Sequence, residues 1–190
     1  EKERFIIQAK YTQDLLKRFK LDDVHPVKFP MPTKCKLDGD PNGKAVDQKV
    51  YHSMIGSLLY LCASRPDIIL SVGICAWFQA ALKESHYVAV KRIFPYLAHT
   101  PNFGLWYPKG ASFNLMGYSD SDWAGDVMDS KSNSFSGGCQ FLGHSLVSWS
   151  SKKQNYVSLS TTKVEYVAAA SCCAQLLWMR QTLKDYGVTC

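Results

Sequence analysis

Apolar residues in the first hundred positions recur every three to four residues, which is the spacing of one face of a helix. This pattern predicts helices over residues 10–20, 50–63, 66–82 and 86–98, after a short strand at residues 5–7. Residues 21–49 contain four prolines, which disfavour a regular helix, so we predict a linker there. The first half of the chain is therefore expected to be helical.

From residue 104 onward the pattern changes to the alternation of half-buried strands. We predict strands over residues 104–107, 112–119, 138–142 and 145–149, the last three forming an antiparallel meander. A long helix is predicted from Thr162 to Tyr186, with Thr161 or Thr162 as its N-cap and Gly187 as its stop.

Three features of the helical half depart from a regular pattern. Pro95 lies inside the predicted helix 86–98, where its missing donor and its clash with the preceding turn cost about 3 kcal/mol or more. Ser85 is the expected N-cap of that helix, and the lone His86 is expected at the surface or in capping rather than in catalysis. The stretch Asp38–Gly43 is interpreted as linker, because its oxygen spacing is incomplete for a calcium loop.

Acidic residues at the end of a predicted strand are the first candidates for chemistry. Asp120 and Asp122 are two positions apart, so both project from the same face of the strand 112–119 as it ends. Their oxygens suit a hard divalent cation, although Ser, Asp and Gly also form solvated acidic turns. Glu165 adds a carboxylate in or near the first turn of the long helix.

Several stretches in the second half resemble the ribonuclease H region of copia-type retrotransposon polyproteins, especially plant ones: "YSDSDWAGD", "SGGCQFLG", "VSWSSKKQ" and "LSTTKVEYVAAASCCAQLLWMRQTL". The earlier stretches "FIIQAKYTQDLLKRF", "YHSMIGSLLYLCASRPDI" and "KRIFPYLAHTPNFGLWY" resemble that family's segment between the reverse transcriptase palm and the ribonuclease H domain. The resemblance runs over nearly the whole chain and follows the family order.

The resemblance implies an α+β fold, in which a helical connection segment precedes a truncated ribonuclease H-like unit. That unit would be a three-stranded antiparallel sheet plus a long helix. The implied domains are residues 1–49, the end of the reverse transcriptase region and a linker; residues 50–103, a helical thumb-like or connection-like segment; and residues 104–190, the N-terminal half of a ribonuclease H-like domain.

The resemblance also implies a chemistry, namely cleavage of the RNA strand of RNA–DNA hybrids by two-metal phosphodiester hydrolysis with Mg²⁺. It makes Asp120 the strand ligand and Glu165 the helix ligand of the metal. Lys163 stands where the family commonly has Glu, but Glu165 matches the catalytic position, so this change need not abolish the site.

The third ligand is expected to be missing from this chain. In the family it is an Asp on a fourth strand beyond the long helix, and this chain ends at Cys190 before any such strand. Asp122 or Asp126 are alternatives, but both are better explained as turn residues. The polymerase motif YxDD is absent as well, so we expect the chain to be inactive by itself.

Composition and charge limit the class of protein, but they do not identify its function. The 190 residues are 46% hydrophobic and 20% charged, which is typical of globular proteins. A net charge of +6 is weak support for a nucleic-acid partner. The first predicted helix has a basic side, which is either a solvated face or a face that contacts phosphates; its cations are Lys10, Lys17, Arg18 and Lys20. No specific nucleic-acid-binding residues are predicted.

Seven cysteines without a CxxC pair or zinc spacing indicate reduced thiols in an intracellular protein. The charged start of the chain is no signal peptide, and the apolar run 68–82 is shorter than the roughly 20 residues of a membrane span. We therefore expect no membrane partner. The resemblance implies cytoplasmic particles or the nucleus as location, with an RNA–DNA hybrid and the remainder of the polyprotein as partners.

Three functional hypotheses follow from the sequence. The first is a fragment of a copia-type polyprotein whose ancestral role is reverse transcription and hybrid cleavage. The second is a non-enzymatic basic module that binds nucleic acid through backbone contacts, which a binding assay across salt concentrations would reveal. The third is a decayed genomic relic without present activity, which the coding sequence downstream of Cys190 would distinguish from an intact element.

Overall fold

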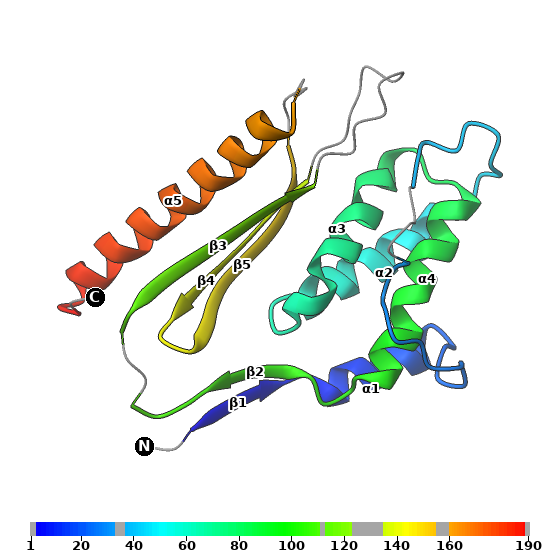
Figure 1. Ribbon diagram of the computed structural model, residues 1–190. Helices are drawn as coiled ribbons and strands as arrows, with labels where there is room; N and C mark the ends of the chain where they lie inside the picture. Colours follow the sequence, from blue (N-terminus) through cyan, green and yellow to red (C-terminus); the bar gives the residue numbers. More distant parts are fainter. Residues whose placement is uncertain (1–2, 33–36, 111–112, 123–134, 155–159, 189–190) are drawn as a thin grey trace. The chain divides into compact units, whose positions relative to one another are not determined.

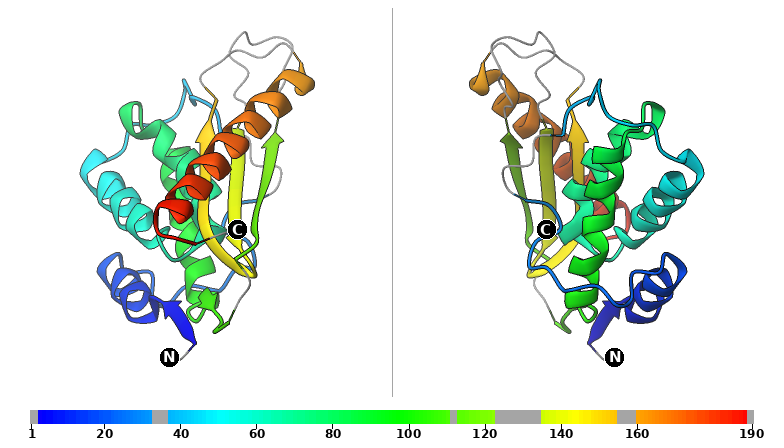
Figure 2. Two further views of the ribbon diagram at one scale, coloured as in Figure 1. Left: turned by 90° about the vertical axis from the view of Figure 1, so that its left-hand side faces the viewer. Right: turned by 90° about the vertical axis from the view of Figure 1, so that its right-hand side faces the viewer.

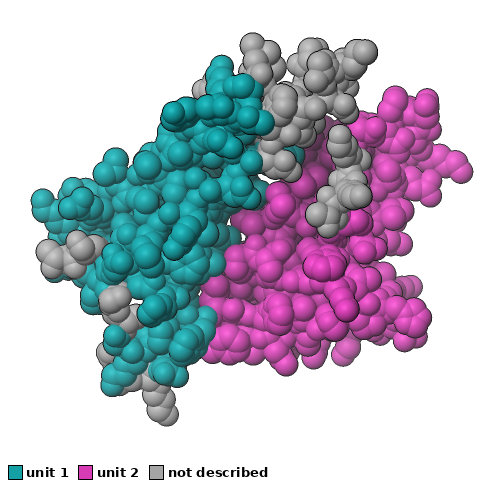
Figure 3. Space-filling model, viewed as in Figure 1, with its two compact units in different colours: residues 1–4, 106–190 teal, residues 5–105 magenta. Residues whose placement is uncertain are grey.

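The structure is a computed structural model that describes residues 3–32, 37–110, 113–122, 135–154 and 160–188. The chain divides into two compact units, which Figure 3 shows in different colours. Phe5–Leu105 form the helical unit, and Trp106–Cys190 form the sheet unit together with Glu1–Arg4. No helix within the described residues is long and apolar enough to span a membrane.

The helical unit is built from α1 (Ala9–Arg18), α2 (Gln48–Leu61), α3 (Ile69–Trp77) and α4 (Glu84–His99), as Figure 1 shows. Apolar side chains from all four helices meet in one core, as their helical spacing predicted. Its fully or almost fully buried members include Leu15, Tyr51, Met54, Ile55, Leu58, Leu61, Val72, Val90, Ile93, Phe94 and Leu97. The helices predicted over 10–20, 50–63 and 86–98 are therefore confirmed with small shifts of their ends, and apolar faces hold the unit together.

The single helix predicted over residues 66–82 is wrong, because this stretch is divided into three pieces. A 3₁₀ turn, η1 (Pro66–Ile68), precedes α3, and a second 3₁₀ turn, η2 (Phe78–Ala80), follows it. The Phe78 ring stacks on the His86 ring with centroids 4.0 Å apart. Apolar spacing continues through a change of helix type, so periodicity alone did not reveal these breaks.

The start of α4 differs from the prediction in its cap. The helix begins at Glu84 with Lys83 as its N-cap, and the Lys83 N–H donates to His86 Nδ1 at 3.1 Å. Ser85, the predicted cap, instead donates its hydroxyl to an Asp40 carboxylate oxygen at 2.7 Å. The capping role expected for His86 is confirmed, whereas the surface position is wrong because the side chain is fully buried.

The turn cluster Asp38–Gly43 packs on the start of α4 through this histidine. His86 Nε2 lies 2.7 Å from the Asp38 carbonyl oxygen, which can only accept a hydrogen bond. Because Nδ1 already accepts the Lys83 N–H, we assign the proton to Nε2. The predicted linker is therefore an ordered loop in this part of the chain.

Pro95 lies inside α4, as predicted, between the buried residues Phe94 and Tyr96. Its ring removes the N–H that would donate to the carbonyl of Lys91 in a regular helix. The helix continues through this position nevertheless and ends only at His99. Burial of the flanking core residues offsets the lost backbone bond.

The sheet unit contains β3 (Leu115–Asp122), β4 (Phe135–Leu142), β5 (Ser145–Lys153) and α5 (Thr161–Asp185). The strands form an antiparallel sheet in the order β3-β4-β5, which confirms the predicted meander. Helix α5 covers one face of this sheet and packs chiefly against β3 (Figures 1 and 2). The α+β class and the arrangement of three strands plus a long helix are thus confirmed.

Both ends of α5 are set by local chemistry. Ser160 is the N-cap, one residue earlier than predicted, and its hydroxyl accepts the Lys163 N–H at 3.3 Å. Gly187 adopts a φ of +74° just after the helix, where Leu183 and Lys184 carbonyls accept the last N–H groups. The predicted glycine stop is confirmed.

A two-stranded ribbon joins residues from the two ends of the helical unit. β1 (Arg4–Ile7) pairs with β2 (Gly104–Tyr107), and the boundary between the units falls within this ribbon. A Cβ atom at Gly104 would collide with the carbonyl oxygen of Ile6. Glycine is therefore required at this point for the two backbones to approach each other.

Candidate functional site

Asp120 lies near the end of β3, two residues before its last residue, as the sequence predicted. It stands opposite Gly137 of β4, and its side chain is exposed. One carboxylate oxygen accepts the Ser121 N–H at 2.9 Å, which holds the group against its own strand. No hydrogen bond from another described residue reaches the second carboxylate oxygen.

Glu165 is the fifth residue of α5 and is also exposed. Its neighbour Val164 is fully buried and fixes this turn against the sheet. The Gln154 side-chain amide, just after β5, donates to the Val164 carbonyl at 3.1 Å. The start of α5 is therefore tied to the end of β5, and Glu165 lies in the second helical turn as predicted.

The two carboxylates lie at the same end of the sheet unit. β3 and β5 run in the same direction, and α5 starts at the end of β5, so α5 runs back along β3. Gly117 faces Cys172 and Leu176. Three strand residues from Gly117 to Asp120 span about 10 Å, and seven helix residues from Cys172 back to Glu165 also span about 10 Å.

The alternation of the strand sets the direction of each side chain. A side chain at Gly117 would project toward α5, since an added Cβ would lie 2.7 Å from Leu176 Cδ1 and 2.9 Å from Cys172 Sγ. Residues 119 and 121 share this face, whereas Asp120 has the opposite parity. A site shared with Glu165 would therefore require the Asp120 carboxylate to pass around β3, which is an edge strand of the described sheet.

No described contact joins Asp120 to Glu165, and a metal shared between them stays a prediction. Among the described residues, no group of three or more His, Cys, Asp or Glu side chains could hold a metal ion. The side chain of Asp122 and the whole of Asp126 lie outside the described residues. Lys163, which stands where the family commonly has Glu, is exposed two residues before Glu165.

Known proteins are similar in sequence to nearly the whole of this chain. The chain is 39% identical over 181 residues to "Retrovirus-related Pol polyprotein from transposon RE2" of Arabidopsis thaliana and 40% identical over 181 residues to the corresponding RE1 polyprotein, matching 95% of this chain and 12% of each relative. It is 34% identical over 196 residues to "Retrovirus-related Pol polyprotein from transposon TNT 1-94" of Nicotiana tabacum, matching 97% of this chain and 14% of that one.

The chain belongs to the retrovirus-related Pol polyproteins of copia-type transposons. The chain spans only 12–14% of the length of these relatives, so it corresponds to a segment of such a polyprotein. No protein-family model matches the chain. No solved structure matches it either.

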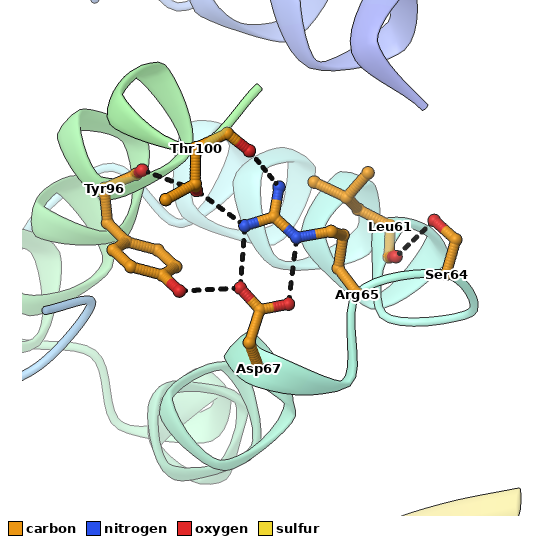
Figure 4. A network of polar contacts seen from close by, with 6 residues as sticks. All are labelled: Leu61, Ser64, Arg65, Asp67, Tyr96 and Thr100. Carbon is orange, nitrogen blue, oxygen red and sulfur yellow. Dashed lines mark hydrogen bonds and ion pairs between the residues drawn. The ribbon is translucent and has the colours of Figure 1, made fainter. Parts of the chain in front are cut away.

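The most elaborate polar arrangement in this Pol segment lies in the helical unit, around Arg65 (Figure 4). The Arg65 side chain is 1% exposed, and its guanidinium forms a bidentate ion pair with Asp67 at 2.9 and 2.7 Å. It also donates to the carbonyl and the hydroxyl of Thr100 at 2.9 and 2.7 Å. One side chain thus connects the turn after α2 to the end of α4.

Aromatic and polar neighbours complete this network. The Tyr96 hydroxyl donates to Asp67 at 2.8 Å, and the guanidinium lies 5.8 Å from the Tyr96 ring centroid and 5.6 Å from that of Phe103. Burial alone would raise the pKa of Asp67, but the hydrogen bonds and charge of Arg65 outweigh it and lower that pKa. Burial and the bond to Asp67 raise the pKa of Tyr96.

Sequence reasoning missed this network. The sequence pattern predicts only a break between the helices 50–63 and 66–82 at this point and gives Arg65 no role. A signal was present, because Arg and Asp two residues apart beside a proline can form a local ion pair. The partner Thr100 lies 35 residues away, and only the folding of α4 brings it to the guanidinium. The network's saturated hydrogen bonds indicate a structural role in the Pol segment.

Proposed function

We propose that this segment supplies two carboxylates, Asp120 and Glu165, to a magnesium-dependent site that cleaves the RNA strand of RNA–DNA hybrids in the intact polyprotein. The observation that supports the proposal is positional: antiparallel packing of α5 on β3 brings both residues to the same end of the sheet unit. The alternative, a solvated acidic turn at Asp120, makes no demand on the position of Glu165, which lies forty-five residues away.

The chemistry of these side chains suits the metal. Carboxylate oxygens are preferred ligands of Mg²⁺, and both groups are exposed, so a phosphodiester can approach them. When bound there, Mg²⁺ would supply an activated water and stabilise charge on the leaving oxygen. The Ser121 N–H orients one Asp120 oxygen, and the burial of Val164 fixes the turn that carries Glu165.

Metal binding tests directly whether Asp120 and Glu165 share a site, and this experiment does not require the third carboxylate that cleavage would need. Mn²⁺ added to the 190-residue chain should broaden the backbone NMR signals around Asp120 and Glu165 together. Asp120→Asn and Glu165→Gln should each abolish the broadening at both places, since neither carboxylate holds the ion alone. If Asp120→Asn leaves the broadening at Glu165 unchanged, the two residues do not share a site.

Asp185→Asn is the matched control for this experiment. Asp185 is an exposed acid on the same helix, and its carboxylate accepts a hydrogen bond from Gln181. Twenty residues separate it from Glu165, which is about 30 Å along the helix. This variant removes one negative charge from the sheet unit but should leave the Mn²⁺ broadening as it is in the wild type.

A further inference from the structure

The helical unit contains a basic groove of about 480 Å³ that the proposed metal site does not use. The end of α1, the first turns of α2 and the middle of α4 line it. Four of its lining side chains are cationic and none is acidic: Arg18, Lys20, Lys49 and Lys91. None of these four has an ion-pair partner within the part of the chain that the structure describes. The groove therefore holds uncompensated positive charge.

Two of these cations are held in place by the protein itself. Arg18 donates to the Ser53 hydroxyl of α2 at 3.0 Å, and the Lys91 ammonium lies 4.7 Å from the centre of the Tyr87 ring. Side chains held in this way lose less conformational freedom when they bind a ligand. The groove is thus partly organised before an anion arrives.

The backbone at Lys20 is an independent indication of function. Lys20 has a φ of +55° directly after α1, and the next residue closes the helix by donating from Leu21 N to the Leu16 carbonyl at 2.8 Å. Glycine is the favoured residue at this position, because any Cβ is strained there. A lysine occupies it and lines the groove, which is the kind of strain found at functional sites.

We propose that this groove binds the phosphodiester backbone of a nucleic acid. Three of its four cations lie on three different helices and the fourth, Lys20, lies just after α1; the volume of the groove exceeds that of a single phosphate group. The Tyr87 ring is covered by Lys91, and the Phe19 ring is engaged by Phe94 and Arg18, so the groove offers no free ring for base stacking. Binding is therefore through phosphates and independent of base sequence.

This inference rests on the proposed function only in taking an RNA–DNA hybrid as the nucleic acid. The experiment measures binding of a labelled 20-base-pair hybrid to the full 190-residue chain in EDTA, where no divalent metal is bound. Failure of the metal site would leave this binding intact. Loss of groove binding would in turn leave the Mn²⁺ experiment intact, so the two failures are distinguishable.

The decisive comparison is between two triple variants of equal charge. Lys20→Gly, Lys49→Gln and Lys91→Gln remove three groove cations, whereas Lys10→Gln, Lys17→Gln and Lys44→Gln remove three exposed lysines of the same unit that do not line the groove. The groove triple should reduce the slope of log K against log salt by about 0.9 per lost phosphate contact, or about 2.7 in all. The control triple should change it by less than about 0.5.

The single variant Lys20→Gly separates binding from folding. Glycine relieves the strained backbone, so the melting temperature should rise or stay the same while hybrid affinity falls about tenfold at 0.1 M salt. In the wild-type chain, bound hybrid should protect Lys20, Lys49 and Lys91 from acetylation more than Lys10 and Lys44. Equal weakening by both triples, or equal protection of all five lysines, would show that net charge alone attracts the nucleic acid.

The same protection experiment tests the other sources of phosphate. Inorganic phosphate and a doubly phosphorylated peptide should protect the three groove lysines only at concentrations well above that of the hybrid. Protection by the phosphopeptide at lower concentration than the hybrid would overturn the assignment to nucleic acid. Absence of hybrid binding by the wild-type chain in low salt would overturn it as well.

Discussion

Replacement of Arg65 by Met tests how the helical unit of this Pol segment is held together. Methionine keeps much of the volume of the side chain but removes all four hydrogen bonds of the guanidinium. Asp67 keeps the Tyr96 hydroxyl and a backbone N–H as donors, and the buried Thr100 carbonyl keeps only the Phe103 N–H at 3.3 Å. The variant therefore leaves the Asp67 carboxylate without its ion-pair partner in a largely dry site.

The expected loss of stability is about 3 kcal/mol. Breaking a buried ion pair by removing one partner costs about 3–5 kcal/mol. Asp67 is 27% exposed, so water partly solvates it after the replacement and the lower end of that range applies. The double variant Arg65→Met, Asp67→Leu should recover about 1–2 kcal/mol of this loss, because no unpaired carboxylate then remains.

Acid provides a second and sharper readout. The pKa of Asp67 is lowered from its ordinary value of 3.8, so the ion pair stabilises the wild type above that pH and the contribution is lost as pH falls through the lowered pKa. In Arg65→Met, burial without the guanidinium raises the pKa of Asp67, and protonation relieves the penalty. The difference between the two proteins should therefore shrink from about pH 7 to about pH 3.

The assay is urea unfolding of the full chain, followed by amide hydrogen exchange in peptides from α2, α3 and α4. This readout reports on the helical unit separately from the sheet unit. Arg92→Met, an exposed position on α4, is the matched control and should change stability by less than about 0.5 kcal/mol. A loss below about 1 kcal/mol in Arg65→Met, or a difference that does not shrink in acid, would refute the argument.

Three further predictions concern the rest of the chain. Pro95→Arg should increase the free energy of unfolding by up to about 3 kcal/mol, and with it the melting temperature, because it restores a backbone donor inside α4. An equal or lower melting temperature would contradict this. Gly117→Ala should destabilise the sheet unit by about 1–3 kcal/mol in urea unfolding, since its Cβ would lie 2.7 Å from Leu176 Cδ1, and Leu176→Ala should recover part of the loss. The 190-residue chain should show no Mg²⁺-dependent cleavage of an RNA–DNA hybrid above background, because its described residues bring no third carboxylate to Asp120 and Glu165; cleavage that disappears in Asp120→Asn would be the contrary result.

Periodicity predicted the helices and strands because each element buries one face, and this face appears in the sequence at a fixed spacing. The Gly187 stop was also predictable, since a left-handed residue after a helix strongly favours glycine. The caps were predicted less well. Ser85 and Thr161 have the correct chemistry for capping, but tertiary contacts and neighbouring hydroxyls decide which residue takes the role, as Ser85 shows by binding Asp40.

The candidate site was predictable only in its placement along the elements. The hydrophobic pattern predicts that Asp120 lies near the end of β3 and Glu165 near the start of α5. The side of the sheet from which Asp120 projects depends instead on the register of β3 against α5. The Arg65 network and the basic groove could not be predicted, because their members come from helices separated by 30 or more residues. Such clusters depend on helix packing, which single-sequence patterns do not encode.

The ribbon of β1 and β2 has a consequence for the order in which the nascent chain can fold. β1 is translated well before its partner strand β2, which ends at Tyr107, about a hundred residues later. At about 5–20 residues per second, β1 emerges several seconds before any pairing is possible. During this interval the apolar residues Phe5, Ile6 and Ile7 have no strand to pair with, and α1 cannot yet pack against the core residues of α4. The helical unit therefore closes only after Tyr107 has been made, and a pause in translation before this residue would prolong the exposure of β1 to other chains.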